Sequence, residues 1–104
     1  MAITKMTRHE ALEWLNVRSG KEASVVLSMN RGGWSIQPVV VRGLLRRAAE
    51  HGDELHETYE VGDAGVLNLS EMPDDAFWLF QARRAEQLRV HVDEHAGIGI
   101  AFRP

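Results

Sequence analysis

The chain has 104 residues, of which 44% are apolar and 26% are charged, with a formal net charge of -3 and no cysteine. This length suits one domain with one hydrophobic core, and the composition argues against a disordered chain. The lack of cysteine excludes disulfides, thiolate metal ligands and thiol nucleophiles. We therefore expect a single globular domain over residues 1–104.

Acidic and basic residues are sorted along the chain. Residues 48–82 carry nine acidic side chains and no Lys or Arg, whereas the remainder carries twelve basic and six acidic side chains. The segment 48–82 thus has a charge of -9 against +6 for the rest. Such charge is either neutralised between neighbouring strands or presented to a partner.

The sequence gives no sign of a membrane or export signal. No apolar run approaches the roughly 20 residues of a membrane span, and residues 1–7 lack the apolar region of a secretory signal. Ten Arg against two Lys are typical of a GC-rich bacterial genome. We expect a cytoplasmic bacterial protein that makes no membrane contact.

The first predicted element is a helix. Thr7-Arg8-His9-Glu10 has the pattern of a capping box, in which the Thr hydroxyl accepts a hydrogen bond from the third helical amide and the Glu side chain reaches back. Apolar residues follow at helical spacing as far as Leu15, and Gly20 can end the helix in a left-handed conformation. The sequence predicts a helix over about residues 8–18.

Two strands are predicted next. Apolar and polar or smaller residues alternate from Ala23 to Asn30, which is typical of a strand with one buried face. Residues 30–33 have turn composition. A further strand begins at Trp34, and because Pro38 cannot donate to a ladder, this strand lies on an edge or carries a bulge.

Residues 39–50 are compatible with either a helix or a strand. The apolar spacing between Pro38 and Gly52 fits an amphipathic helix. Three consecutive valines and the central Gly43 argue against it, because both residue types disfavour a helix interior. We favour a strand over Val39–Arg46, with Gly43 at a sharp bend.

The acidic segment contains a similar ambiguity. Residues 57–69 predict a strand that is interrupted by a bulge or tight turn at Gly62–Gly65, and residues 71–75 predict a loop. Residues 74–87 are compatible with a helix, but the aromatic cluster at residues 77–80 favours a strand.

The last part of the chain predicts a β-hairpin. Apolar residues alternate in Leu88, Val90 and Val92, and again in Ile98, Ile100 and Phe102, on either side of a turn at 93–97. The fold predicted from all elements is mainly β, a small, partly open barrel of about five to six strands with an N-terminal helix. The alternative is an α+β fold with additional helices at 39–50 and 74–87.

The order of elements resembles an SH3-like barrel of the Sm type, in which a helix precedes five strongly curved strands. The resemblance rests on this layout and on the mid-strand glycine, Gly43. The stretch Glu60–Asn68 does not reproduce the Asp and the Met-Asn pair of the family's first motif. Residues 83–86 stand where the family has an Arg-Gly step. The resemblance therefore implies a fold, and no binding residue is carried over from it.

No motif indicates an enzyme, a cofactor or a metal. His91 and His95 flank two acids in the last predicted turn, but no histidine spacing matches a metal-ligand motif. The serines lack the context of a nucleophile elbow, and the glycine pairs at 32–33 and 97–99 fit turns better than phosphate loops. We expect a non-catalytic protein with no cofactor and no metal site.

The aromatic residues indicate a contact surface. Four large apolar residues in succession on a strand must point to both faces of the sheet, so part of the cluster at 77–80 is exposed. The predicted interaction residues are Phe77, Trp78, Phe80 and Trp34. We therefore expect a protein-interaction or assembly module whose partner is another protein or a second copy, with the acidic segment as a further contact surface.

Two alternatives remain open. One is nucleic-acid (RNA) binding through an Arg-rich strand face formed by Arg42, Arg46 and Arg47, although a pI of about 5.9 argues against nucleic acid as a partner. If the strand at 39–48 pairs with the strand at 57–66, two of these arginines instead face Glu57 and Glu60. The other alternative is a small ligand-binding protein or enzyme.

Overall fold

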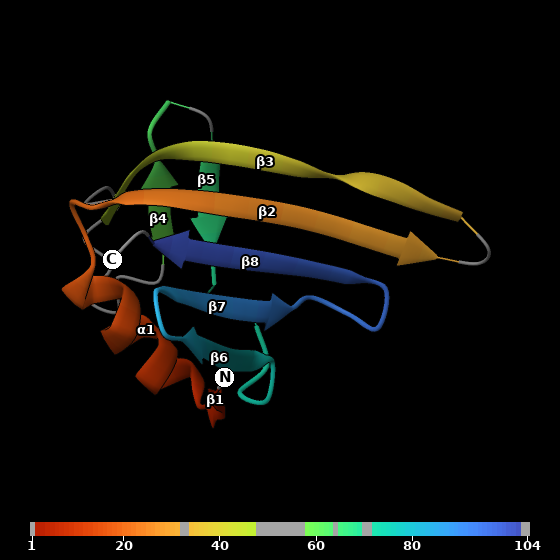
Figure 1. The fold of residues 1–104 in the computed structure, drawn as a ribbon, viewed down its shortest axis with the longest axis horizontal. Coiled ribbons are helices and arrows are strands. Elements are labelled where there is room, and N and C mark those ends of the chain that lie inside the picture. Colours follow the sequence, from red (N-terminus) through yellow and green to blue (C-terminus); the bar gives the residue numbers. More distant parts are fainter. Residues whose placement is uncertain (1, 32–33, 48–57, 64, 70–71, 103–104) are drawn as a thin grey trace.

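The computed structural model describes residues 2–31, 34–47, 58–63, 65–69 and 72–102. This part of the chain has one helix and eight strands, and Figure 1 shows how they are arranged. In chain order they are β1 (Ala2–Met6), α1 (Arg8–Val17), β2 (Glu22–Arg31), β3 (Trp34–Arg47), β4 (Thr58–Val61), β5 (Gly65–Asn68), β6 (Phe77–Ala82), β7 (Ala85–His91) and β8 (Ala96–Phe102).

The described strands form one antiparallel sheet in the order β1-β6-β7-β8-β2-β3-β4-β5. β3 links its two halves, since it pairs with β2 as far as Leu44 and with β4 from Leu45 onward. β1 and β5 are the edges, so the sheet does not close into a barrel. The predicted class, mainly β with an N-terminal helix, is confirmed, whereas the strands number eight rather than five to six in the described part.

The capping box forms as predicted. The Thr7 hydroxyl accepts a hydrogen bond from the Glu10 amide at 3.1 Å, and the Glu10 carboxylate accepts one from the Thr7 amide at 3.0 Å. The helix ends at Val17, and Gly20 follows with a φ of 92°, a left-handed conformation that suits glycine. The Gly20 amide donates to the Leu45 carbonyl oxygen, which leads the chain from α1 into β2.

Both conditions that would accommodate Pro38 in a strand are met. The register of β2 and β3 shifts between the pairs Leu27↔Val39 and Met29↔Ile36, so Pro38 lies at a bulge. The pairing of β3 with β4 begins only at Leu45, so in the described part the other side of β3 is an open edge here. The missing N–H of the proline therefore costs no ladder hydrogen bond.

Both ambiguous segments form strands where they are described. Residues 39–47 belong to β3, and residues 48–50 lie outside the described part. Residues 77–82 and 85–91 form the β6–β7 hairpin, so the alternative of additional helices at 39–50 and 74–87 is wrong for the described residues. The predicted tight turn after residue 61 joins β4 to β5, and the C-terminal hairpin is β7–β8.

The edge strand β1 was not predicted from the sequence. It pairs with β6 over five residues, from Ala2↔Gln81 to Met6↔Phe77. Only Ile3 and Met6 in it are large and apolar, and Ile3 is exposed. The strand therefore forms by pairing with β6, which a local pattern does not reveal.

The core lies between α1 and one face of the sheet, and the β4–β5 hairpin closes it on one side. Tyr59 on β4 is fully buried, and its hydroxyl donates to the Asn16 side-chain oxygen at 2.6 Å. The largest fully buried side chains are Tyr59, Phe77, Leu15, Leu45, Leu69, Leu88, Ile100 and Val90. This core joins the helix to both halves of the sheet.

Two glycines allow the β4 turn to cross close to β3. A Cβ atom built on Gly43 would lie 2.9 Å from the Cα and the amide nitrogen of Gly62. Gly62 also has a φ of 52°, and its amide donates to the Leu44 carbonyl oxygen at 2.9 Å. The glycine predicted to mark a bend in β3 therefore lies where the pairing of β3 passes from β2 to β4.

We expect Gly43→Ala to lower the free energy of unfolding by about 1–3 kcal/mol, because the added methyl group would overlap backbone atoms that cannot move independently. Gly97→Ala is the matched control, since its Cβ would meet its nearest atoms at 3.6 and 3.7 Å, which is ordinary contact. Urea denaturation of both variants measures the difference. Equal stabilities for the two variants would contradict a tight crossing at Gly43.

Candidate functional site

The predicted aromatic cluster is divided between the two faces of the sheet. Phe77 is fully buried in the core, whereas Trp78 and Phe80 lie on the outer face, opposite α1, and are partly exposed. The Lys5 ammonium lies 5.5 Å from the centre of the Trp78 ring, and the Arg89 guanidinium lies 3.9 Å from that of Phe80. Cations thus already cover part of both exposed rings.

The remaining predicted residues do not form one patch in the described part. The backbone of Trp34 pairs with Arg31 at the far end of the β2–β3 hairpin, and the Trp34 side chain lies outside the description. Arg46 is directly opposite Glu60, and Arg47 is opposite Tyr59. The predicted cross-strand placement of Arg46 beside Glu60 is thus confirmed, while Glu57 lies outside the described residues. The register places these two opposite charges on the same face of neighbouring strands.

A different surface stands out on the core face of β2. Burial ends abruptly along this strand: Ala23 and Val25 are 1% and 3% exposed, but Leu27 and Met29 are 42% and 43% exposed. A ten-residue strand spans about 33 Å, whereas a ten-residue helix spans about 15 Å. A single helix of this length cannot cover the whole strand, so the core face continues without cover (Figure 1).

The uncovered side chains are neighbours across the strands. Leu27 pairs with Val39 on β3 and with the partly buried Ile98 on β8, and Met29 pairs with Ala96. The backbone of Val92 hydrogen-bonds to Ala96, which places Val92 in the same row. Four exposed residues therefore form an apolar patch: Leu27, Met29 and Val39 on the projecting β2–β3 hairpin, and Val92 at the neighbouring β7–β8 turn. Such a patch is typical of an association surface.

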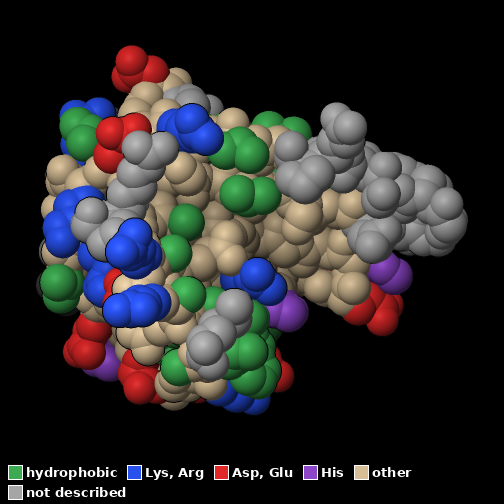
Figure 2. Space-filling model, viewed as in Figure 1, with side chains coloured by type: hydrophobic (Ala, Val, Ile, Leu, Met, Phe, Trp, Pro, Cys, Tyr) green, Lys and Arg blue, Asp and Glu red, His purple; other side chains and the backbone are tan. Residues whose placement is uncertain are grey.

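Charged side chains gather at the opposite end of the molecule. Figure 2 shows basic side chains where α1 leads into β2, far from the tip of the β2–β3 hairpin. A hollow of about 240 Å³ opens there between the end of α1 and the β6–β7 turn. We call its four basic residues the basic end: Arg18, Lys21, Arg83 and Arg84.

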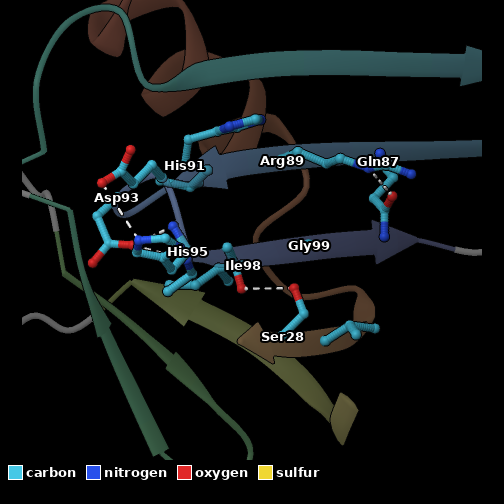
Figure 3. Close-up of a pocket in the computed structure, with 13 residues that line it drawn as sticks. Ser28, Gln87, Arg89, His91, Asp93, His95, Ile98 and Gly99 are labelled. Atoms are coloured by element: carbon cyan, nitrogen blue, oxygen red, sulfur yellow. Dashed lines mark hydrogen bonds and ion pairs between the residues drawn. The ribbon is translucent and has the colours of Figure 1, made fainter. Parts of the chain in front are cut away.

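A second hollow, of about 350 Å³, lies over β7, β8 and β2. Figure 3 shows His91, Asp93 and His95 at one end of it and Gln87 at the other. The Asp93 carboxylate accepts the amides of His95 and Ala96, which shapes the β7–β8 turn. Arg89 donates to the Gln87 side chain at 2.8 Å. These polar groups serve the protein's own turn and strand, and their arrangement indicates no particular ligand.

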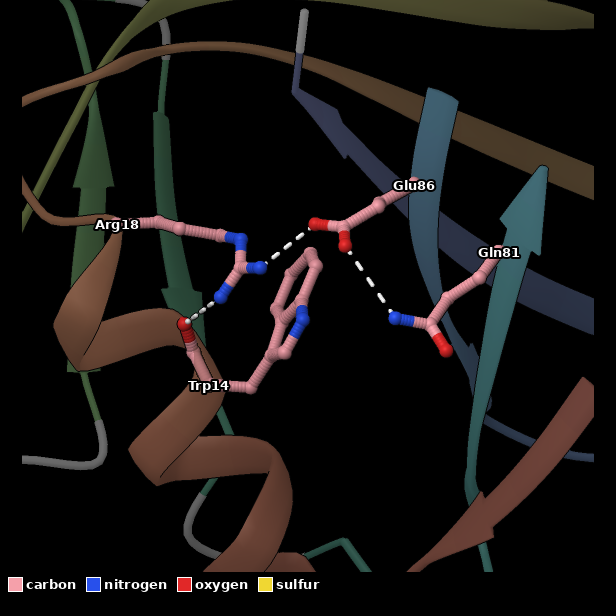
Figure 4. A network of polar contacts seen from close by, with 4 residues as sticks. All are labelled: Trp14, Arg18, Gln81 and Glu86. Atoms are coloured by element: carbon pink, nitrogen blue, oxygen red, sulfur yellow. Dashed lines mark hydrogen bonds and ion pairs between the residues drawn. The ribbon is translucent and has the colours of Figure 1, made fainter. Parts of the chain in front are cut away.

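One ion pair fastens the end of α1 to the sheet (Figure 4). The Arg18 guanidinium donates to the Glu86 carboxylate at 2.6 Å and to the Trp14 carbonyl oxygen at 3.0 Å, and it stacks 3.9 Å from the centre of the Trp14 ring. The amide of Gln81 donates to the other Glu86 oxygen at 3.3 Å. The Arg18 hydrogen bond holds the pKa of Glu86 below its ordinary value, although partial burial opposes the shift.

Comparisons with known proteins do not place this chain in a family. No family model, curated protein or solved structure matches the chain. Within the described residues, no three histidine or acidic side chains come together to hold a metal ion, and no helix has the length and apolar character to cross a membrane. The resemblance to Sm-like barrels stays a prediction.

Sequence analysis missed the apolar patch. Leu27 and Met29 have the same alternation as the buried Ala23 and Val25, so the pattern alone assigns all four to the core. The sequence offers one sign of this exposure, which is the length of the predicted elements. The predicted N-terminal helix is too short to cover a strand whose one face is apolar throughout.

We expect the stability difference between the wild type and Glu86→Gln to depend on pH. Because the folded-state pKa of Glu86 lies below that of the unfolded chain, its contribution is complete above the unfolded-state pKa and is lost as the pH falls through the folded-state pKa. Glu86 is 35% exposed, so solvent screening limits the contribution at neutral pH to about 1 kcal/mol or less.

Urea denaturation at neutral pH and at about pH 2 checks this expectation. Glu22→Gln is the matched control, because it removes the same charge from an exposed position on β2 outside this network. A difference that is unchanged between the two pH values would contradict the role of the ion pair.

Proposed function

We propose that this chain is a non-catalytic protein-interaction module that associates through the apolar patch. The observation that carries the proposal is the loss of cover along β2, where the exposed fraction rises from 3% at Val25 to 42% at Leu27 on the same face. Burying apolar side chains of this size against a partner contributes about 25 cal/mol per Å² of area removed from water. The patch provides a favourable contact that the chain's own helix does not make.

A second copy of the chain is the partner that fits this patch. An isologous dimer brings the same surface of both protomers together, so each apolar side chain meets another across a two-fold axis. The four members of the patch are uncharged, and Asp93 and Glu94 lie at its rim beside Met29.

The proposed function is the protein-interaction module expected from the sequence, but its contact surface is the apolar patch rather than the aromatic cluster. Phe77 is in the core and cannot contact a partner, and Trp78 and Phe80 are partly covered by Lys5 and Arg89. The Arg42, Arg46 and Arg47 alternative for RNA gains no support from the pairing of Arg46 with Glu60. The patch on β2 and β3 is therefore the surface to test first.

We expect the wild-type protein to show a concentration-dependent mass in sedimentation velocity, and Leu27→Glu to weaken its dimerisation at least about tenfold, because a desolvated carboxylate would oppose its symmetry mate. Val17→Glu is the matched control, since Val17 is 76% exposed on α1 and lies away from the patch. Trp78→Ser tests the aromatic cluster on the outer face in the same assay.

The three variants separate the possible surfaces. Loss of association in Leu27→Glu alone supports the patch, and loss in Trp78→Ser alone would move the interface to the outer face. A wild-type protein that stays monomeric from micromolar to millimolar concentration would overturn self-association.

A further inference from the structure

We propose that the hollow at the basic end binds a phosphate group. This inference is independent of the association surface, because the two lie at opposite ends of the molecule (Figures 1 and 2). It rests on the convergence of cations around one hollow, on the residues chosen for the β6–β7 turn, and on the match between their charge and a phosphate dianion.

The four cations of the basic end come from separate parts of the chain. Arg18 follows α1, Lys21 precedes β2, and Arg83 and Arg84 form the β6–β7 turn, yet all four line one hollow of about 240 Å³. The fold therefore assembles them, since no sequence pattern places them together. Phe102 provides an apolar wall beside them.

The hollow has an excess of positive charge. Among the described residues of its lining, Glu86 is the one acid, and that carboxylate is already bound by Arg18 at 2.6 Å. In the described part of the chain, neither Arg83 nor Arg84 pairs with an acidic side chain. The remaining charge is about three positive units in a chain whose net charge is -3.

The β6–β7 turn is an unusual place for two arginines. Ala82 pairs with Ala85, so Arg83 and Arg84 are the two residues of a tight hairpin loop. Two-residue loops strongly favour Asn-Gly and similar pairs, because they usually require positive φ angles. Side chains that the turn geometry does not favour are expected where function sets the choice of residue. We infer that these positions serve to present charge.

A phosphate group fits this site better than a carboxylate. The planar guanidinium presents paired donors that match phosphate oxygens, and Arg83 and Arg84 offer two such groups side by side. A phosphate dianion neutralises more of the excess charge than a single carboxylate does. The phosphate can belong to a free nucleotide or to the backbone of a single-stranded nucleic acid, and the two sources require separate measurements.

The test uses the full chain at low ionic strength, where phosphate contacts are strongest. Calorimetric titration with inorganic phosphate and with ADP measures the free ligands, and fluorescence anisotropy with a labelled ten-nucleotide oligothymidylate measures the polymer. Binding of the free ligands identifies a small-molecule site, whereas binding of the oligonucleotide alone identifies a backbone site.

The decisive variant is Arg83→Asn/Arg84→Gly, which installs the preferred turn. We expect it to weaken phosphate binding at least about tenfold, because two charge-assisted contacts are lost, and not to lower the Tm, because Asn-Gly is a pair that two-residue hairpin loops favour. An undiminished Tm with a loss of binding cannot come from misfolding. Arg42→Gln/Arg46→Gln is the matched control, since it removes the same charge from β3 and should retain binding.

Three results would overturn the proposal. The first is no binding of phosphate, ADP or oligonucleotide by the wild type. The second is an equal loss of binding in the β3 control, which would show a response to net charge rather than a site. The third is binding of an oligoglutamate peptide with no binding of any phosphate ligand, which would assign the basic end to acidic protein segments.

Discussion

The close approach of Gly43 and Gly62 is the constraint on which the arrangement of this fold depends. It lets the β4 turn cross the backbone of β3 at a distance that excludes any side chain at Gly43. At this crossing β3 leaves the pairing with β2 and begins the pairing with β4. The same strand therefore serves both halves of the sheet, and Tyr59 on β4 reaches the helix to close the core.

Because β3 is long, part of the sheet lies beyond the reach of α1 at the end away from the crossing. Fourteen residues in this strand require a long partner, and β2 supplies ten. One ten-residue helix provides the cover over their core face. On the core face of β2, Ala23 and Val25 near the crossing are buried, whereas Leu27 and Met29 farther along are not. The exposed patch is therefore a geometric consequence of joining two half-sheets through one long strand.

The elements that follow local rules could be predicted from the sequence. The capping box fixed the start of α1, alternation identified β2 and the β7–β8 hairpin, and Gly43 marked the crossing. Features that depend on contacts with residues far along the chain could not be predicted. β1 has no alternating apolar pattern and forms because β6 offers an edge. Alternation showed that residues 77–80 point to both faces, but it could not assign Phe77 to the core.

The candidate surfaces show the same division. The sequence separates a -9 segment from a +6 remainder, and the register of β3 and β4 places Arg46 against Glu60, as expected from charge alone. The sequence does not show that Glu86, outside the acidic segment, binds Arg18 at the end of the helix. Because Arg18 already binds the Glu86 carboxylate, this acid does not neutralise the two arginines of the neighbouring turn. The basic end therefore gathers charge that no strand register predicts, since in the described part Arg83 and Arg84 have no acidic partner and lie beside the Arg18–Glu86 pair.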